Sequence, residues 1–373
     1  MPAAGEPCCS GAFISRTMWV TATTGRTRER LRLPLRRTIL TDAHAPDSAP
    51  ANALDSAQAS VISHTTHITD AEAARVTQAA LNVEVLAVSR QSLTQSGNAI
   101  FRVQLADGRT VAARINPRRD MFAFTQHNLD ALRKLGLPVP HVLATGVTAA
   151  QGSFVILEWV PGRDLQYELA GMATQQMTRL AETLSGYQKR VASLPESKGF
   201  GWAPFRRNAA GAHWTDIFGL TSNAGPADDA PPLEHIRARL RAVRRSVEPY
   251  FASLRPICFL DDVTVRNVLV EHGELQGIID VDFVCYGDPL MAVGTTLAHV
   301  AADVGEAGHF YGDELIRCAT PSWDAQRAIY FYGSLWLTGF LAAAETAGQT
   351  QRAAELLRAT DAMLRNAEAD LPA

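Results

Sequence analysis

The sequence predicts an α+β chain with two lobes: a small lobe built on an antiparallel sheet, and a larger, mostly helical lobe. Three observations predict this arrangement. Apolar runs joined by a glycine-containing turn occur early in the chain, within 83–115, and a second such pair occurs at 268–280. Segments with helical periodicity fill much of the remaining sequence. With 373 residues, 47% of them apolar, the chain is long enough to fill two cores.

Composition and charge exclude several classes of protein. The formal net charge of −3 shows no excess of positive charge of the kind that nucleic-acid binding requires. The five cysteines contain no CxxC pair, which predicts reduced thiols and a cytoplasmic protein. The uncharged stretch 328–344 is shorter than the ~20 residues a membrane span needs and contains tyrosine, serine and threonine, so we expect a buried helix there and no membrane partner.

Residues 1–65 differ from the rest of the chain. They contain a run of arginines between Arg16 and Arg37, followed by a tract rich in alanine, proline, serine and aspartate. No apolar segment of the secretory type is present. We interpret this region as a disordered leader, with a transit-like segment as the alternative, and we place no chemistry in it.

The small lobe is predicted to span residues 66–160. Thr69 and Glu72 form a capping-box pattern for a helix that ends near Leu81. Strand-like runs follow at 83–88, 99–105 and 110–115, the last two joined by a hairpin turn, and a helix is expected at 122–135. A final run at 154–158 is expected to form an edge strand that leads into the second lobe.

The large lobe is predicted to span residues 161–373. Helices are expected at 174–194, 234–247 and 290–304, with an apolar helix around Trp336 and an amphipathic helix at the end of the chain. The stretch 195–232 is rich in loop residues. Its tryptophans either line a substrate cleft or pack as satellite core, and the second interpretation is favoured.

The most informative stretch runs from Phe259 to Pro289. Two alternating apolar runs flank His272-Gly273, which is a hairpin signal. Asp262 and Asn267 precede the first strand, and Asp280 closes the second. Because the open ends of a hairpin lie side by side, we expect these side chains to converge. Carboxylate and amide oxygens suit Mg²⁺, although acids that only cap the turns of an ordinary hairpin are the alternative.

The order and spacing of these residues are those of kinase catalytic and metal-binding segments. In that chemistry one aspartate accepts the proton of the substrate hydroxyl, here Asp262. The asparagine and the second aspartate hold Mg²⁺ against the nucleotide phosphates, here Asn267 and Asp280. Asp288-Pro289 has the order of a helix cap followed by its first residue, which predicts a structural role for Asp288.

This stretch resembles the aminoglycoside phosphotransferase family, whose members usually carry His-Gly-Asp-x-x-x-x-Asn, a strand ending Ile-Asp, and then Gly-Asp-Pro. The resemblance extends over residues from about 83 to 345 and also includes the phrase Gly136-Leu137-Pro138-Val139-Pro140. It implies a two-lobed protein-kinase-like fold. It further implies transfer of phosphate from ATP, with GTP as the alternative, to a hydroxyl of a small molecule. Leu260 and Asp261 replace the family histidine and glycine.

The resemblance also implies residues for the nucleotide. The Ser96-Gly97-Asn98 loop is similar to the family's phosphate-covering loop, with a plain hairpin turn as the alternative. Arg114 occupies the strand position of the phosphate-pairing cation, a task that the bidentate guanidinium can perform. Glu158, Trp159 and Val160 correspond to the hinge that reads an adenine edge. Arg266 would place a positive charge near the transferred group.

One further departure affects the cation. The family's partner for it is a glutamate on the next helix, and Asn128 stands at that position, with Asp130 as a substitute nearby. The main alternative function is therefore a non-catalytic nucleotide- or metabolite-binding protein of the same fold. A protein kinase is disfavoured because its glycine-rich loop, Phe-Gly pair and Ala-Pro-Glu segment are missing from the sequence. Aminoglycosides, choline-like alcohols, sugars and hydroxy amino acids all remain open as acceptors.

Overall fold

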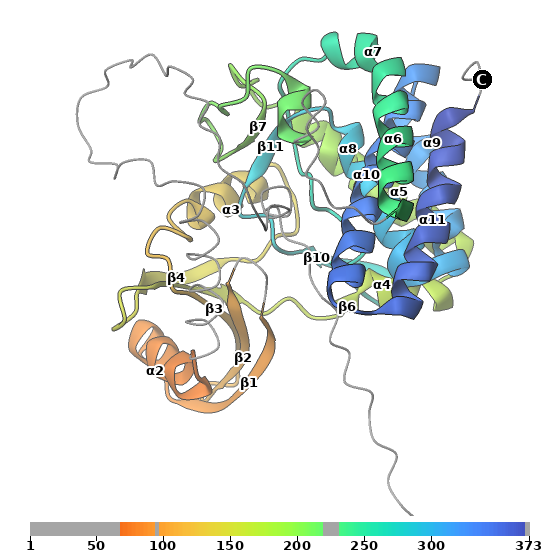
Figure 1. Cartoon of the computed structure of the whole chain (residues 1–373). Coiled ribbons are helices and arrows are strands. Elements are labelled where there is room, and N and C mark those ends of the chain that lie inside the picture. Colours follow the sequence, from red (N-terminus) through yellow and green to blue (C-terminus); the bar gives the residue numbers. More distant parts are fainter. Residues whose placement is uncertain (1–67, 94–96, 219–230, 370–373) are drawn as a thin grey trace, which may run out of the picture.

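The computed structural model describes residues 68–93, 97–218 and 231–369, which form two lobes (Figure 1). The predicted leader and Ser96 lie outside the described residues. The small lobe holds the early strands and the large lobe is mostly helical, so the predicted fold class is confirmed. The linker between the lobes follows β5 (Ser153–Glu158) and precedes β6 (Arg163–Asp164), a short strand of the large lobe.

The small lobe is built on a five-stranded antiparallel sheet with the order β1-β2-β3-β5-β4. β2 and β3 form the predicted hairpin, and Gly108 takes the positive φ of +87° that its turn requires. The strands not yet given are β1 (Val85–Leu93), β2 (Ala99–Leu105), β3 (Thr110–Asn116) and β4 (Val142–Val147).

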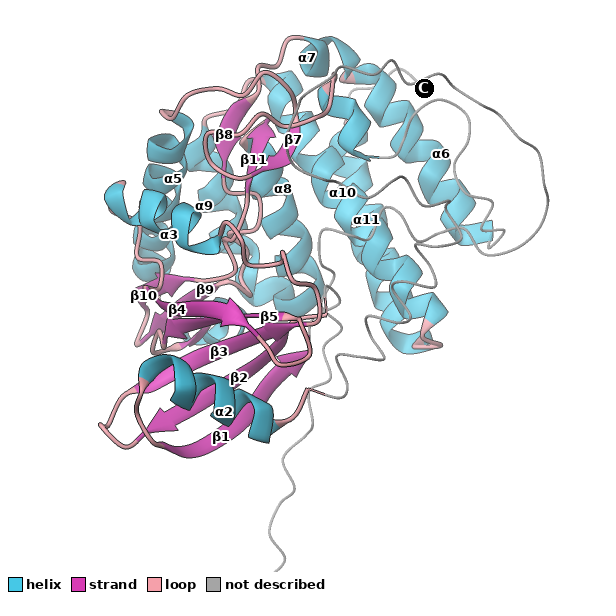
Figure 2. Cartoon of the chain, turned by 90° about the vertical axis from the view of Figure 1, so that its left-hand side faces the viewer, coloured by secondary structure: helices cyan, strands magenta, loops and turns pink. Residues whose placement is uncertain are grey.

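One face of this sheet is covered by α2 (Asp70–Leu81), which crosses the strands in Figure 2. The Thr69 hydroxyl accepts the Glu72 N–H at 3.2 Å, so the predicted helix start is confirmed. Val76 on the helix belongs to the same buried cluster as Phe101 and Val103 of β2. The opposite face of the sheet packs against the rest of the protein, through residues such as Val155 and Leu157 of β5.

The prediction that 154–158 is an edge strand is wrong. β5 pairs with β3 on one side and with β4 on the other, and its residues Ser153–Leu157 are all buried. β4 is the edge, and no strand was predicted there. The continuous burial explains the unbroken apolar run Phe154–Leu157, because an interior strand of a covered sheet has no solvent face.

The large lobe surrounds two small sheets, ordered β10-β9-β6 and β7-β11-β8. Its other strands are β7 (Gly201–Ala203), β8 (Ile257–Phe259), β9 (Val268–Glu271), β10 (Glu274–Ile278) and β11 (Val284–Gly287). Its helices are α4 (Leu165–Glu168), α5 (Thr174–Ala192), α6 (Pro231–Ser246), α7 (Glu248–Ala252), α8 (Leu290–His299), α9 (His309–Ala319), α10 (Trp323–Thr346) and α11 (Thr350–Glu368). Among the described residues, no helix combines the length and apolar character that crossing a membrane requires.

Asp288 has the structural role that the sequence predicts, although α8 begins at Leu290, one residue later than the cap-and-proline pattern predicts, with Pro289 and not Asp288 at the N-cap position. Its carboxylate accepts the Leu290 N–H at 3.0 Å and the hydroxyls of Tyr250 and Tyr332 at 2.9 and 2.7 Å. Burial raises the pKa of Asp288 above its usual value, and these three donors oppose that shift. Trp214, 2% exposed, donates its indole N–H to the same Tyr332 oxygen at 2.7 Å, so this tryptophan belongs to the core.

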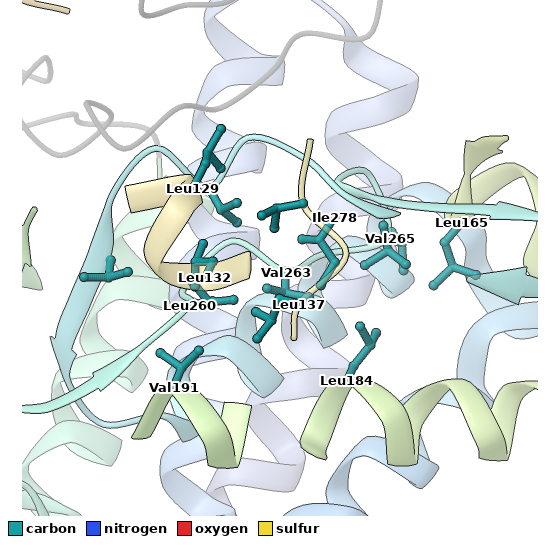
Figure 3. Packing of buried hydrophobic residues seen from close by; sticks show 14 of the residues in the cluster. Leu129, Leu132, Leu137, Leu165, Leu184, Val191, Leu260, Val263, Val265 and Ile278 are labelled. Atoms are coloured by element: carbon teal, nitrogen blue, oxygen red, sulfur yellow. The ribbon is translucent and has the colours of Figure 1, made fainter. Parts of the chain in front are cut away.

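A large apolar cluster joins the lobes. It includes Leu129 and Leu132 of α3 (Thr125–Lys134), Leu184 and Val191 of α5, and Leu260 between them (Figure 3). α3 begins three residues later than predicted, because residues before Thr125 form turns closed by the Ala123 and Thr125 N–H groups. The segment that precedes Asp262 is thus packed between a helix of each lobe.

We predict that Gly294→Ala destabilises the protein. A Cβ atom at Gly294 in α8 would lie 2.5 Å from the Ile329 carbonyl oxygen and 2.6 Å from Cβ of Tyr332 in α10. Such contacts force the two helices apart, at a cost of about 1–3 kcal/mol of unfolding free energy in urea titrations.

The matched control is Gly186→Ala in α5, where an added Cβ meets no atom within 4 Å. We expect that change to stabilise the protein by up to about 1 kcal/mol, because alanine loses less backbone entropy in a helix. Equal stability of the two variants would contradict the close crossing of α8 and α10.

Candidate active site

The hairpin of β9 and β10 brings Asn267 beside Asp280. Its turn residues His272 and Gly273 both have positive φ, 54° and 80°, which is the geometry of a type I′ turn. At the open end the Ile279 N–H donates to the Asn267 carbonyl at 2.9 Å. Asp280 directly follows Ile279 in the left-handed region, at φ 59°. The two residues predicted to hold Mg²⁺ are therefore neighbours in space.

Asp262 lies on the loop that leads into the same hairpin. The Asn267 side-chain N–H donates to the Asp262 carbonyl at 2.9 Å, and the Thr264 carbonyl accepts the N–H groups of Asn267 and Val268 at 3.0 and 3.1 Å. Because the Asn267 nitrogen is used in this way, its side-chain oxygen is the atom that would meet a cation. Asn267 thus belongs both to the loop and to the candidate metal site.

Arg114 reaches across from the small lobe to this hairpin. A nitrogen of its guanidinium lies 3.0 Å from one Asp280 oxygen and 2.6 Å from one Asp282 oxygen. Arg114 is 6% exposed, and its guanidinium carbon lies 5.3 Å from the centre of the Phe122 ring. Burial acts to lower the pKa of Arg114, but Asp282 and Asp280 outweigh it and raise that pKa. The predicted phosphate-pairing cation is therefore held by carboxylates of the other lobe.

Asp282 is a residue that the sequence reasoning missed. It follows Asp280 by two positions, and this closeness in sequence to a candidate metal ligand is the one signal that could have pointed to it. Asp282 is 8% exposed, and its second oxygen is buried without a hydrogen-bond partner among the described residues. A buried, unsatisfied carboxylate oxygen is costly, so this position favours a further donor or a cation.

Asn128 takes a different role from the one anticipated. Its side-chain nitrogen donates to the Asp282 carbonyl, and its oxygen accepts the Phe205 N–H at 3.1 Å. The alternative, that Asp130 replaces the helix glutamate as partner of Arg114, is wrong, because Arg114 pairs with Asp280 and Asp282. Asp130 pairs with Arg133 of the same helix at 3.3 Å. Asn128 therefore connects α3 to the segment that follows β10 and to the loop after β7.

Arg266 points into a buried cluster of the large lobe. Two of its nitrogens donate to Asp303 at 2.8 and 2.7 Å, and His299 and Arg352 also contact Asp303, at 3.0 and 3.2 Å. Burial acts to raise the pKa of Asp303, but the bonds from His299 and Arg266 dominate and hold it well below its usual value. In this arrangement the Arg266 charge neutralises Asp303 and anchors the loop beside Asn267.

The residues predicted to contact a nucleotide are divided between two places. Gly97 takes a positive φ of 79°, and the buried Asn98 side chain accepts the Asn116 side-chain N–H at 2.7 Å. Glu158, Trp159 and Val160 border a groove of about 760 Å³, which also touches α3 and Gln276. Arg114 and Asp280 are not among the residues that line this groove.

Two carboxylates and one amide fit a divalent cation that also binds phosphate and water oxygens. Asp280 and Asp282 supply the carboxylates, and Asn267 supplies the amide oxygen. Among the described residues, no group of three or more histidine, cysteine, aspartate or glutamate side chains is gathered for a metal. Three oxygen ligands from the protein leave room for the non-protein ligands that Mg²⁺ usually retains.

Comparisons with known proteins agree with this fold. Residues 93–331 match the phosphotransferase enzyme family. One similar solved structure is that of a thermostable mutant of aminoglycoside phosphotransferase APH(4)-Ia in a ternary complex with AMP-PNP and hygromycin B. Its sequence is 18% identical to this chain, the match covers 77% of this chain and 96% of that chain, and the TM-score is 0.58. The GDP complex of aminoglycoside 2'-phosphotransferase-IIIa is 15% identical, with coverages of 76% and 94% and a TM-score of 0.55.

A putative fructosamine-3-kinase from Thermobifida fusca is 18% identical, with coverages of 80% and 100% and a TM-score of 0.51. No curated protein sequence matches the chain. At these identities the solved structures establish the fold, which is that of kinase-like phosphotransferases. The sequence match over 93–331 assigns the family: the chain belongs to the phosphotransferase enzyme family.

We predict that stability falls as the solution is acidified below about pH 6.5, the ordinary histidine pKa. His299 is buried against Phe340, and burial lowers its pKa despite the bond to Asp303; the Arg266 charge acts in the same direction. Between the lowered pKa and about 6.5 the unfolded chain binds more protons than the folded one, so acidification favours unfolding. Urea titrations at pH 7.5 and 5.5 measure this loss.

The variant His299→Gln should lose less stability over the same pH interval, because it has no imidazole to protonate. His213→Gln, at an exposed position, serves as the control and should behave like the wild type. An unchanged pH dependence in His299→Gln would show that the buried histidine does not contribute.

Proposed function

We propose that this protein transfers the γ-phosphoryl group of ATP to a hydroxyl of a small molecule, with Mg²⁺ as cofactor. The observation that supports it most is the convergence of Arg114 from the small lobe with Asp280 and Asp282 from the large lobe, beside Asn267. A cation, carboxylates and an amide oxygen at one point are the groups that hold a metal–triphosphate.

Each of these residues has a separate task in phosphoryl transfer. Asp280 and the Asn267 oxygen hold Mg²⁺. The unsatisfied oxygen of Asp282, two residues after Asp280, is available as a further ligand. Arg114 pairs with phosphate oxygens, for which its planar guanidinium is suited. When bound, Mg²⁺ neutralises charge on the phosphates.

Asp262 orients the acceptor and takes its proton. The hydroxyl oxygen forms a bond to the γ-phosphorus as the bond from that phosphorus to the bridging oxygen breaks, and ADP leaves. The hydroxyl proton passes to the Asp262 carboxylate, as in other phosphoryl transfers that depend on positioning. The Asp262 carbonyl is fixed by Asn267, so the base and the metal site share one rigid loop.

In the proposed reaction Arg114 pairs with carboxylates before the nucleotide binds and with phosphate oxygens afterwards. In the structure it pairs with both carboxylates, which would otherwise repel one another. With Mg²⁺ and a nucleotide bound, Asp280 would hold the metal instead of Arg114, and Arg114 would be free to pair with phosphate oxygens. This exchange predicts that Mg²⁺ and nucleotide assist each other's binding.

The acceptor is proposed only by class. The neighbours in the comparisons include a complex with hygromycin B and a putative fructosamine-3-kinase, whose ligands carry several hydroxyls. GTP is the alternative phosphate donor, because another neighbour was solved with GDP. Polyhydroxylated small molecules are accordingly the first compounds to screen.

We predict that ATP with Mg²⁺ raises the melting temperature of the wild-type protein. A ligand at about 100 times its Kd adds about 3 kcal/mol of stability to the folded state. Asp280→Ala should lose the part of this shift that requires Mg²⁺. Differential scanning fluorimetry with ATP, GTP and each nucleotide without metal measures both effects.

Asp120→Ala is the control, because this exposed carboxylate lies outside the site and should leave the shift unchanged. If neither ATP nor GTP at millimolar concentration shifts the wild type, the nucleotide-dependent function is wrong. If the shift is present but no phosphate leaves the nucleotide with any acceptor, the non-catalytic alternative is supported.

A further inference from the structure

The catalytic loop lacks the histidine that usually precedes the family's catalytic aspartate by two residues, and Leu260 stands in its place. Leu260 is 1% exposed, and its side chain packs in the cluster between α3 and α5 (Figure 3). A leucine side chain cannot hydrogen-bond, so it cannot hold the loop as a histidine would. The loop therefore needs support from another part of the chain.

The backbone of Leu260 lies just beyond the end of a strand ladder. β8 pairs with β11 only as far as Phe259, which faces Cys285. The N–H and C=O groups of the next residue are therefore desolvated without a strand partner, and a buried backbone group left in that state is costly.

Gln188 on α5 supplies both partners. Its side-chain oxygen accepts the Leu260 N–H at 3.0 Å, and its side-chain nitrogen donates to the Leu260 carbonyl at 2.6 Å. One primary amide thus acts on Leu260 as a neighbouring strand would. Leu184 and Val191, which flank Gln188 along α5, are buried in the same cluster, so the helix that carries the amide is itself fixed.

The next residue is held from a different direction. Asp261 is 4% exposed, and one of its oxygens accepts the Trp202 indole N–H at 2.6 Å. Trp202 lies on β7, which pairs with β11. The two residues before Asp262 are thus each fixed by a side chain of the large lobe, Leu260 by Gln188 and Asp261 by Trp202.

We propose that Gln188 is a positioning residue for phosphoryl transfer: it fixes the Leu260 backbone and thereby the place of the Asp262 carboxylate. This inference rests on the proposed function. Gln188 contacts no group assigned above to nucleotide or metal, so its loss should affect the rate of transfer and not the binding of Mg²⁺–ATP. Trp202 supports the same loop through Asp261.

The test uses Gln188→Leu, which keeps the approximate shape of the side chain and removes both hydrogen bonds. The full chain is assayed for Mg²⁺-dependent release of ADP, with water or a screened alcohol as acceptor. We expect kcat to fall about 10- to 100-fold, because a small displacement of a positioned group has effects of this size. KM for ATP and the Mg²⁺–ATP thermal shift should stay as in the wild type.

Gln176→Leu is the matched control. Gln176 is also on α5, is also partly buried, and also makes two hydrogen bonds to the main chain, with Ala173 and His272 at 2.9 and 3.0 Å. Those bonds lie away from Asp262, so we expect lower stability at most and an unchanged kcat. Trp202→Phe, which keeps a ring but removes the N–H, should lower kcat as Gln188→Leu does.

The outcomes separate this inference from the function on which it rests. Absence of turnover in the wild type, with or without ATP binding, overturns the function and the inference together. Wild-type turnover with equal kcat in Gln188→Leu and Gln176→Leu overturns the inference alone. If Gln188→Leu does not fold, an unchanged kcat in Trp202→Phe overturns the claim that these side chains position the loop.

Discussion

A buried ion pair between the lobes organises this protein. Arg114 belongs to β3, and the carboxylates of Asp280 and Asp282 belong to the segment that follows β10. A charge taken out of water is tolerated only when it is paired, and removal of one partner typically costs about 3–5 kcal/mol. The sheet of the small lobe is therefore positioned against the β9–β10 hairpin by the same atoms that are suited to bind phosphate and metal.

The features that depart from the family pattern are compensated in the structure. Leu260 is supported by Gln188, Asp261 by Trp202, and Asn128 connects α3 with the Asp282 backbone and with the loop after β7. Read singly, each departure suggests a lost function. In the structure, the loop before Asp262 and helix α3 are held by side chains other than those of the family pattern. The geometry around Asp262 therefore supports an active enzyme better than the sequence pattern alone does.

The local features of the fold could be predicted from the sequence. Both hairpins are defined by their turns, and the structural role of Asp288 beside the start of α8 follows from its place before a proline. The interior position of β5 could not be predicted, because it depends on pairing with β4, a strand that follows a proline-rich turn. The sequence shows only an apolar run at this place, and such a run is compatible with an edge strand as well as with an interior strand.

The same limit applies to the candidate site. Asp262, Asn267 and Asp280 lie close in sequence, so their spacing carries information about their geometry. Asp282 as partner of Arg114, Asp303 as partner of Arg266, and Gln188 as partner of Leu260 are long-range contacts. Many carboxylates and amides are equally available along the chain, and only tertiary packing selects among them.

The most direct test of the central claim is a crystal structure with Mn²⁺ and a non-hydrolysable ATP analogue, in which anomalous scattering locates the metal. We predict metal–oxygen distances of about 2.1–2.2 Å to Asp280 and Asn267, with the Arg114 guanidinium moved onto phosphate oxygens. A metal bound elsewhere, or Arg114 still paired with Asp280 beside a bound nucleotide, would contradict the claim that the interlobe ion pair is the nucleotide–metal site.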